Sequence, residues 1–286
     1  MSEGSTVVLL TSSHRLKLNR AKRHFDLLNG EISAFLDLEP FGAVFGKPGP
    51  EAAVIPILGI VKVEPSLEWP VIVGDCVHNL RSGLDHLAWE LAGVQGRAQP
   101  GTEFPVFLDR DKYWRMSGGR PARGSGLHKV RGMNQHIQEV IEGLQPYNRS
   151  DGPPDLHPLW LLQQLSNEDK HKALSVIGTV MEDSEVNILR REGSGCVELE
   201  HVFDYGVPLR NGAQIGYLRV VRSEAPISGP PLEMEFAVDG TFFVAFGKER
   251  AGRGLRVLDT LASVANYISL TVLPQLEPLL SPPRVG

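Results

Sequence analysis

Cysteine is scarce in this sequence, and long apolar runs are missing. Only two cysteines, Cys76 and Cys196, occur in the 286 residues, and neither lies in the C-x-x-C spacing of zinc ligands, so we expect no disulfide framework. The apolar run Val7–Leu10 is too short for the core of a signal peptide. No window approaches the roughly 18 apolar residues that a membrane helix requires. We therefore expect a cytoplasmic protein that does not bind membranes.

A general excess of basic charge is also missing. The chain has 29 Lys and Arg against 34 Asp and Glu, a net charge of −5, which argues against a dedicated high-affinity nucleic-acid binder. Between residues 110 and 131 the balance reverses, with seven Lys or Arg and one acid. This segment is either an ordinary solvated loop or a local arm that attracts phosphate.

Hydrophobic periodicity predicts an α+β protein that is mainly α. A bundle of about four to five helices is expected, and an early β-hairpin and a later antiparallel four-stranded β segment would be added to it. A short strand is expected at FPVF, residues 104–107. We expect one domain, 1–286. Its bundle would comprise 12–38, 75–94, 133–177 (as 133–145 and 156–177) and 253–280, and its β additions 41–64 and 186–247.

The stretch GDCVHNLRSGLDHLAWELAG, Gly74–Gly93, is the most informative in the chain. It predicts a helix with Asp75 as N-cap and an apolar face that suffices for folding. Gly83 inside this helix predicts a close approach by a neighbouring backbone. The opposite face is polar but contains few ordinary surface residues. It collects His78, Asn79, Arg81, Ser82, Asp85, His86 and Trp89.

A second polar stripe is expected on the helix 156–177. At helical spacing, Trp160, Gln164, Asn167 and His171 share one side. Buried polar groups need hydrogen-bond partners, so two antiparallel helices could supply each other's. We therefore expect the two stripes to meet in a polar seam.

Three interpretations of these residues follow from chemistry alone. The seam can be a buried hydrogen-bonded network that fixes helix register. His78, His86, Asp85 and His171 are acceptable metal ligands, but no HExxH spacing is present, so we expect no metal and no cofactor. Ser82 and Cys76 lack the sequence context of a catalytic nucleophile.

A fourth interpretation rests on resemblance. Arg81-Ser-Gly-Leu-Asp-His86 is an R-x4-H pattern on a helix and resembles the motif of the HEPN superfamily, small helical bundles found in toxin–antitoxin, CRISPR and antiviral systems. HNLRSGLDHLAWELA, NEDKHKAL and FPVF are also similar to a group of uncharacterised bacterial proteins that is common in actinobacteria.

The HEPN resemblance implies a metal-independent endoribonuclease, with a defence or toxin-like role, an RNA substrate and a homodimer. His86 would be the acid and base, Arg81 would hold the scissile phosphate, and Asp85 would orient them. The surrounding binding residues would be His78, Asn79, Ser82, Asn167 and His171. The alternative is a non-enzymatic HEPN-like scaffold or partner-binding protein whose polar seam is structural.

Overall fold

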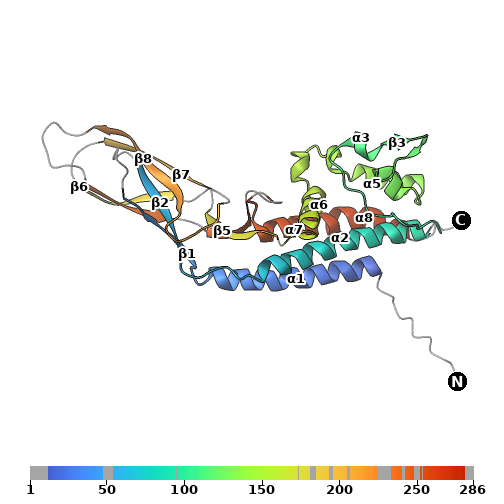
Figure 1. Ribbon diagram of the computed structural model, residues 1–286, viewed down its shortest axis with the longest axis horizontal. Helices are drawn as coiled ribbons and strands as arrows, with labels where there is room; N and C mark the ends of the chain where they lie inside the picture. Colours follow the sequence, from blue (N-terminus) through green and yellow to red (C-terminus); the bar gives the residue numbers. More distant parts are fainter. Residues whose placement is uncertain are drawn as a thin grey trace, which may run out of the picture. The chain divides into compact units, whose positions relative to one another are not determined.

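The computed structural model of the protein comprises two compact units (Figure 1). Unit 1 comprises Met1–Leu27, Ile72–Ala173 and Thr260–Gly286, and unit 2 comprises Leu28–Val71 and Leu174–Asp259. Three of the four boundaries between the units fall inside helices. The single domain 1–286 therefore stays a prediction. The structure describes residues 12–47, 54–94, 96–172, 174–180, 185–192, 196–204, 207–224, 233–239, 242–247, 252 and 254–280.

Unit 1 is built on long helices. They are α1 (Ser13–Leu36), α2 (Trp69–Val94) and a C-terminal run that passes from α7 (Val257–Tyr267) through a π-helical turn (Ile268–Val272) to α8 (Leu273–Leu276). A final 3-10 turn covers Glu277–Leu280. Figure 1 shows α1 and α2 side by side. The α+β, mainly α fold class is thus confirmed.

Helix α2 buries an apolar stripe and begins earlier than the sequence predicts. The stripe comprises Val73, Val77, Leu80, Leu84, Leu87 and Leu91. The helix starts at Trp69 because Pro70 lies in its first turn, where no backbone N–H is required for the helix. Asp75 is therefore an interior residue of α2, and the prediction that it is the N-cap is wrong.

Two glycines let other elements approach α2 closely. A Cβ on Gly83 would lie 2.7 Å from Leu18 Cδ2 of α1, so the predicted tight packing at Gly83 is confirmed. A Cβ on Gly74 would lie 2.3 Å from Asp169 Oδ1 of α6 (Pro158–Asp169). Helix α1 is thus the neighbour of α2 at Gly83, and α6 contacts α2 at Gly74, nearer the N-terminal end of α2.

The middle of unit 1 contains short elements in place of a long loop. The prediction of a strand at FPVF, residues 104–107, is wrong, because these residues pair with no strand of the described part of the chain. The backbone N–H groups of Phe104 and Phe107 bond instead to the side chains of Asp85 and Gln145. The elements are α3 (Arg110–Tyr113), β3 (Met116–Ser117), β4 (Arg120–Pro121), α4 (Gly126–Val130), α5 (Gln135–Gly143) and 3-10 turns at Pro146–Asn148 and Pro154–Leu156.

The predicted helix 156–177 is shorter in the structure. It ends at Asp169, and Val176–Val180 forms strand β5 in unit 2. The segment VIGTV is rich in β-branched residues, which favour strands over helices. The prediction of helix up to residue 177 is therefore wrong at its C-terminal end.

The sheets of unit 2 combine early and late strands. The hairpin β1 (Phe41–Phe45) and β2 (Val54–Val61) continues into β8 (Gln214–Glu224) and β7 (Cys196–Phe203), giving an antiparallel four-stranded sheet in the order β1-β2-β8-β7. Two further antiparallel pairs are β10 (Phe242–Phe246) with β5, and β6 (Glu185–Glu192) with β9 (Glu233–Asp239).

His157 caps α6 and makes unit 1 sensitive to acid. Its Nδ1 accepts the backbone N–H of Leu159 at 3.2 Å, and its ring packs edge-on against Tyr267. Burial, helped by the cation of Arg149, lowers the pKa of His157 to about 4. The neutral ring is therefore favoured in the folded state, so stability is fully present above pH 6.5 and falls as the pH drops from there towards 4.

Replacing His157 by asparagine is expected to remove this acid sensitivity. The amide can keep the N-cap but cannot take a proton. Between pH 6.5 and 4 the wild-type chain should lose roughly 2 kcal/mol more than His157→Asn. Urea unfolding at each pH measures the difference, and parallel pH profiles for the two proteins would contradict it.

Candidate functional site

Arg81 lies inside a closed group of bonds that we call the Arg81 clasp: Arg81, Asp85 and the backbone of Phe104. Arg81 Nε donates to Asp85 Oδ2 at 3.2 Å, and Nη2 donates to Asp85 Oδ1 at 2.5 Å and to the carbonyl of Phe104. Asp85 Oδ1 also accepts the N–H of Phe104 at 3.0 Å. Arg81 is 7% exposed, and its Nη1 is buried with no hydrogen-bond partner in the part of the chain that the structure describes. The clasp therefore fastens the segment around Phe104 to α2.

His86 takes part in a different set of contacts. Its Nδ1 lies 2.9 Å from Ser13 Oγ, at the start of α1. Ser13 donates its single hydroxyl hydrogen to Glu90 Oε1 at 2.7 Å, so Nδ1 is the donor to Ser13. In the neutral ring Nε2 is then an acceptor, and no described residue bonds to it. Arg81 and His86 thus face different neighbours on α2.

The remaining predicted site residues are not brought together. His78 is exposed, Ser82 is half-buried, and Asn79 donates to the carbonyl of Asp75 one turn earlier at 2.8 Å. Asn167 is exposed and accepts from Gln163 on its own helix at 2.8 Å.

The predicted seam is therefore wrong. His171 is exposed beyond the end of α6, and Trp160 Nε1 is buried with no hydrogen-bond partner among the described residues. The polar groups of the two stripes that do form hydrogen bonds bond within their own helix, to the Phe104 segment or to α1. The seam required α6 to lie along the motif face of α2, but α1 and the Phe104 segment contact that helix there.

A shallow groove of about 500 Å³ runs between α1 and α2, and we call it the histidine groove. Lys17 and Arg20 provide fixed positive charge, and Asp75 provides the opposing carboxylate. Arg20 Nε donates to His24 Nε2 at 3.0 Å. The residues around the groove are Ser13, Leu16, Lys17, Arg20, His24, Asp75, His78, Asn79 and His86. Its chemistry suits a small anion better than a metal ion.

His14 forms a buried network that the sequence analysis missed. The ring is 1% exposed and lies between two carboxylates, with Nδ1 2.6 Å from Glu90 Oε2 and Nε2 2.9 Å from Glu277 Oε1. Arg15 adds a second bond to Glu277 at 2.5 Å. The His14 network, residues His14, Arg15, Glu90 and Glu277, joins α1, α2 and the C-terminal turn. Nothing in the sequence pairs residues this far apart, so no pattern could have found it.

The same imidazole superficially resembles part of a nucleophilic triad. Ser12 Oγ lies 3.5 Å from Nε2, while Nδ1 bonds to the carboxylate of Glu90. Nε2 is nearer to Glu277 than to Ser12, so the ring nitrogen that would serve as the base already has a partner. This arrangement favours a structural role for the imidazole.

A second hollow, the apolar groove, lies between α1 and the C-terminal helices. It has a volume of about 680 Å³, with Leu18, Ala21 and Phe25 on one side and Cys76 and Leu80 of α2 also lining it. The π-helical turn contributes Ile268 and Ser269. An 18-residue window within Val257–Leu280 has a mean hydropathy of 1.3, so this run is long and apolar enough to cross a membrane by length and composition alone. The expectation that no window would approach this limit is thus wrong, although core helices of soluble proteins meet it as well.

Cys76 is expected to be chemically inert in the folded protein. Its thiol contacts the carbonyl of Ala21, and burial raises its pKa to about 12, so the reactive thiolate is absent at neutral pH. In a Cys196→Ser background, Ellman's reagent at pH 8 should label Cys76 only after denaturation. Rapid labelling of the native protein would contradict this.

Among the residues that the structure describes, no group of three or more His, Cys, Asp or Glu side chains could hold a metal ion. His78, His86, Asp85 and His171, the residues considered as ligands, do not form such a group. In comparisons with family models, curated proteins and solved structures, the chain matched none.

Proposed function

We propose that this chain is a non-enzymatic, HEPN-like scaffold or partner-binding protein in which the polar face of α2 is structural. The Arg81 clasp carries the proposal. A guanidinium that holds a phosphate needs free N–H groups on one edge, whereas those of Nε and Nη2 are bonded to Asp85 and Phe104. Binding a phosphate through them would separate a largely buried ion pair.

The position of His86 supports the same proposal. It lies five positions after Arg81, which corresponds to a rotation of about 500°, or roughly 140° around the helix. Consistent with this angle, Arg81 bonds to the Phe104 segment and His86 bonds to Ser13. Acid–base catalysis requires the proton donor and the phosphate clamp to reach the same group. The R-x4-H pair lacks that convergence within one chain.

One observation favours the endoribonuclease as a second candidate. His86 lines the histidine groove together with Lys17 and Arg20, and its Nε2 has no partner among the described residues. In that version of the site, His86 transfers the proton and the α1 cations hold the phosphate. Arg81 and Asp85 then only position the helix, and a second protomer could supply the other acid or base.

The two candidates differ in a single assay. Purified wild-type protein, His86→Ala and Lys17→Ala/Arg20→Ala are incubated with mixed RNA in EDTA and examined on denaturing gels. We expect intact RNA with all three proteins. Cleavage by the wild type that is lost in His86→Ala, with an unchanged melting temperature, would instead establish the nuclease.

A further inference from the structure

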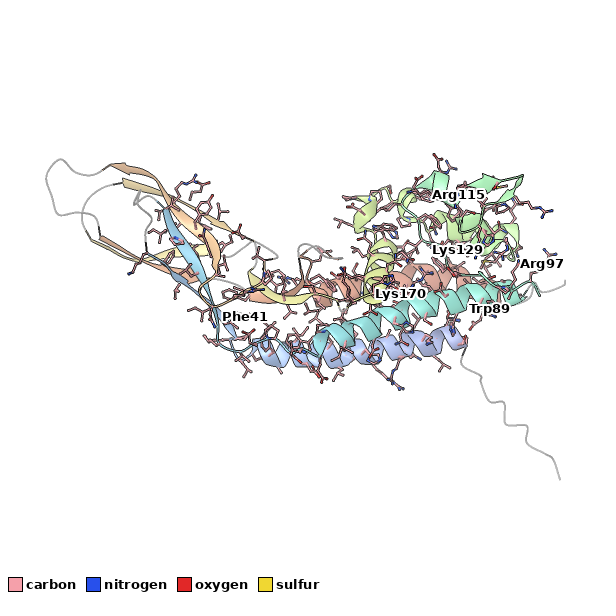
Figure 2. The ribbon with its side chains drawn as sticks, in the orientation of Figure 1. Phe41, Trp89, Arg97, Arg115, Lys129 and Lys170 are labelled. Atoms are coloured by element: carbon pink, nitrogen blue, oxygen red, sulfur yellow. The ribbon has the colours of Figure 1, made fainter. Side chains whose placement is uncertain are left out.

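The segment between α2 and α5 has a charge opposite to that of the whole chain. Residues 96–132 contain eight cations and three carboxylates, whereas the whole chain has a net charge of −5. We call this segment the basic lobe. Figure 2 shows three of its cations, Arg97, Arg115 and Lys129, on the same part of unit 1. The full set of cations is Arg97, Arg110, Lys112, Arg115, Arg120, Arg123, Lys129 and Arg131.

Only part of this positive charge is neutralised locally. Lys129 pairs with Glu103 at 3.0 Å, while Lys112 and Arg110 make long pairs with Asp109 and Glu142 at 3.9 and 4.0 Å. The other five cations, all arginines, have no ion pair with a carboxylate of the described residues. They are Arg97, Arg115, Arg120, Arg123 and Arg131. No carboxylate of the described residues therefore neutralises the charge of these five guanidinium groups.

A narrow hairpin presents some of these arginines. Strands β3 and β4 pair through Met116–Pro121 and Ser117–Arg120, and the turn is Gly118-Gly119, with φ of 58° and 75°. Two successive positive φ values are typical of the tight I′ turn, which glycine adopts without strain. Residues 114–120 are all exposed, so the hairpin projects into solvent.

Hydrogen bonds from two arginines of the basic lobe to backbone carbonyls hold together the segments at the base of the hairpin. Arg115 Nη2 donates to the carbonyl of Arg123 at 3.0 Å across the base. Arg131 donates to the carbonyls of Pro100 and His128. Burial and the neighbouring cations Arg131, Arg123 and Lys129 lower the pKa of His128.

An exposed aromatic ring adjoins the same arginines. Trp114 is 45% exposed and immediately precedes Arg115. Its Nε1 donates to Glu142 at 3.4 Å, which anchors one edge of the indole. A positively charged surface with an accessible ring suits nucleic acid, because arginine forks bind phosphates and bases stack on aromatic faces. An acidic peptide would need the cations but not the ring.

We propose that the basic lobe binds the phosphate backbone of single-stranded nucleic acid, with the β3–β4 hairpin as its principal contact. The inference rests on the proposed function as a binding protein and names the class of partner. Phosphates would bind Arg120, Arg123 and the adjacent arginines, and a base would stack on Trp114. A two-stranded ribbon is also narrow enough for the major groove of a duplex, so duplex binding is a separate arm of the test.

Fluorescence anisotropy with a labelled 20-nucleotide RNA of mixed sequence tests this proposal. The variant is Arg120→Glu/Arg123→Glu, and its matched control is Lys62→Glu/Arg210→Glu, which makes the same change in net charge at exposed positions of unit 2. At low salt the hairpin variant should bind at least about tenfold more weakly than the control. The slope of log affinity against log salt should fall by about 0.7 per lost phosphate contact.

Competition identifies the class of partner. Unlabelled single-stranded RNA or DNA should displace the probe, whereas duplexes of either, polyglutamate and anionic phosphatidylserine vesicles should do so at least about tenfold less well. Equal losses in the two double variants would overturn the proposal, as would no binding by the wild type or equal competition by polyglutamate. Stronger competition by duplexes would overturn its single-stranded part. The same samples on denaturing gels separate the two proposals, since cleavage contradicts the non-enzymatic function but leaves the binding surface in place.

Discussion

Replacing His14 by alanine should lower the free energy of unfolding by about 3 kcal/mol, one of the two largest effects expected of a single substitution here. The substitution leaves Glu90 and Glu277 facing each other across the vacated space without the imidazole that bonds to both. Burial raises the pKa of Glu90, but hydrogen bonds from Ser13 and His14 outweigh it, so that its pKa lies below its ordinary value. Glu277 behaves likewise through Arg15 and His14. Urea unfolding at pH 7 measures the loss.

A pH series and a control on the same helix make the His14 prediction sharper. The lowered pKa values mean that the two ionised carboxylates contribute stability above their ordinary pKa, and that this contribution is lost as the pH falls through the lowered values. The difference between wild type and His14→Ala should therefore shrink in strong acid. His24→Ala, whose half-buried ring bonds only to Arg20, should change stability by less than about 0.5 kcal/mol. Equal effects at the two histidines would contradict the role of the network.

Arg81→Ala is expected to destabilise the fold by a comparable amount, roughly 3 kcal/mol, without removing an activity. The carbonyl of Phe104 loses its donor and Asp85 keeps only the backbone N–H of Phe104. Because the clasp fastens this segment, the effect should be local as well as global. Hydrogen exchange of the Phe104 amide should accelerate more than that of amides in the middle of α1.

Two further substitutions distinguish the contribution of the planar guanidinium geometry of Arg81 from that of its positive charge. Arg81→Lys keeps the charge but cannot bond to two groups in the planar geometry of a guanidinium, so it should recover only part of the stability. Arg23→Ala, at an exposed arginine of α1, should have little effect. If Arg81→Ala had the melting temperature of the wild type, the structural role of the clasp would be refuted.

The sequence could predict the helices and strands that their own periodicity determines. The apolar stripe of α2 and the closely packed Gly83 are of this kind. The predicted N-terminal end of α2 was wrong because Asp75, predicted as the N-cap, is an interior residue of a helix that begins at Trp69 with Pro70 in its first turn. The predicted C-terminal end of the helix 156–177 was wrong because Val176 and Ile177 pair with β10. The start of α2 depends on the backbone geometry of its first turn, and the end of the predicted helix 156–177 depends on a strand far away in the sequence.

The candidate site was harder to predict for the same reason. The sequence showed that Arg81, Asp85 and His86 lie on the polar face, and an i,i+4 pair such as Arg81–Asp85 follows from helix geometry. It could not show that Phe104 would supply a carbonyl to Arg81, or that Ser13 would bond to His86. Those partners come from segments whose proximity depends on packing. The R-x4-H pattern therefore singled out the polar face of α2, while the chemistry of that face depends on partners from other segments.

The His14 network also bears on the order in which the molecule can assemble during synthesis. His14 and Glu277 are separated by 263 positions, and unit 1 consists of three separate stretches of the chain. While α7 and α8 are still within the ribosome, the apolar side chains that α1 and α2 present to the C-terminal helices stay uncovered. We expect the last helices to complete unit 1 after the strands of unit 2 have emerged, which makes nascent chains ending before residue 257 natural clients for chaperones.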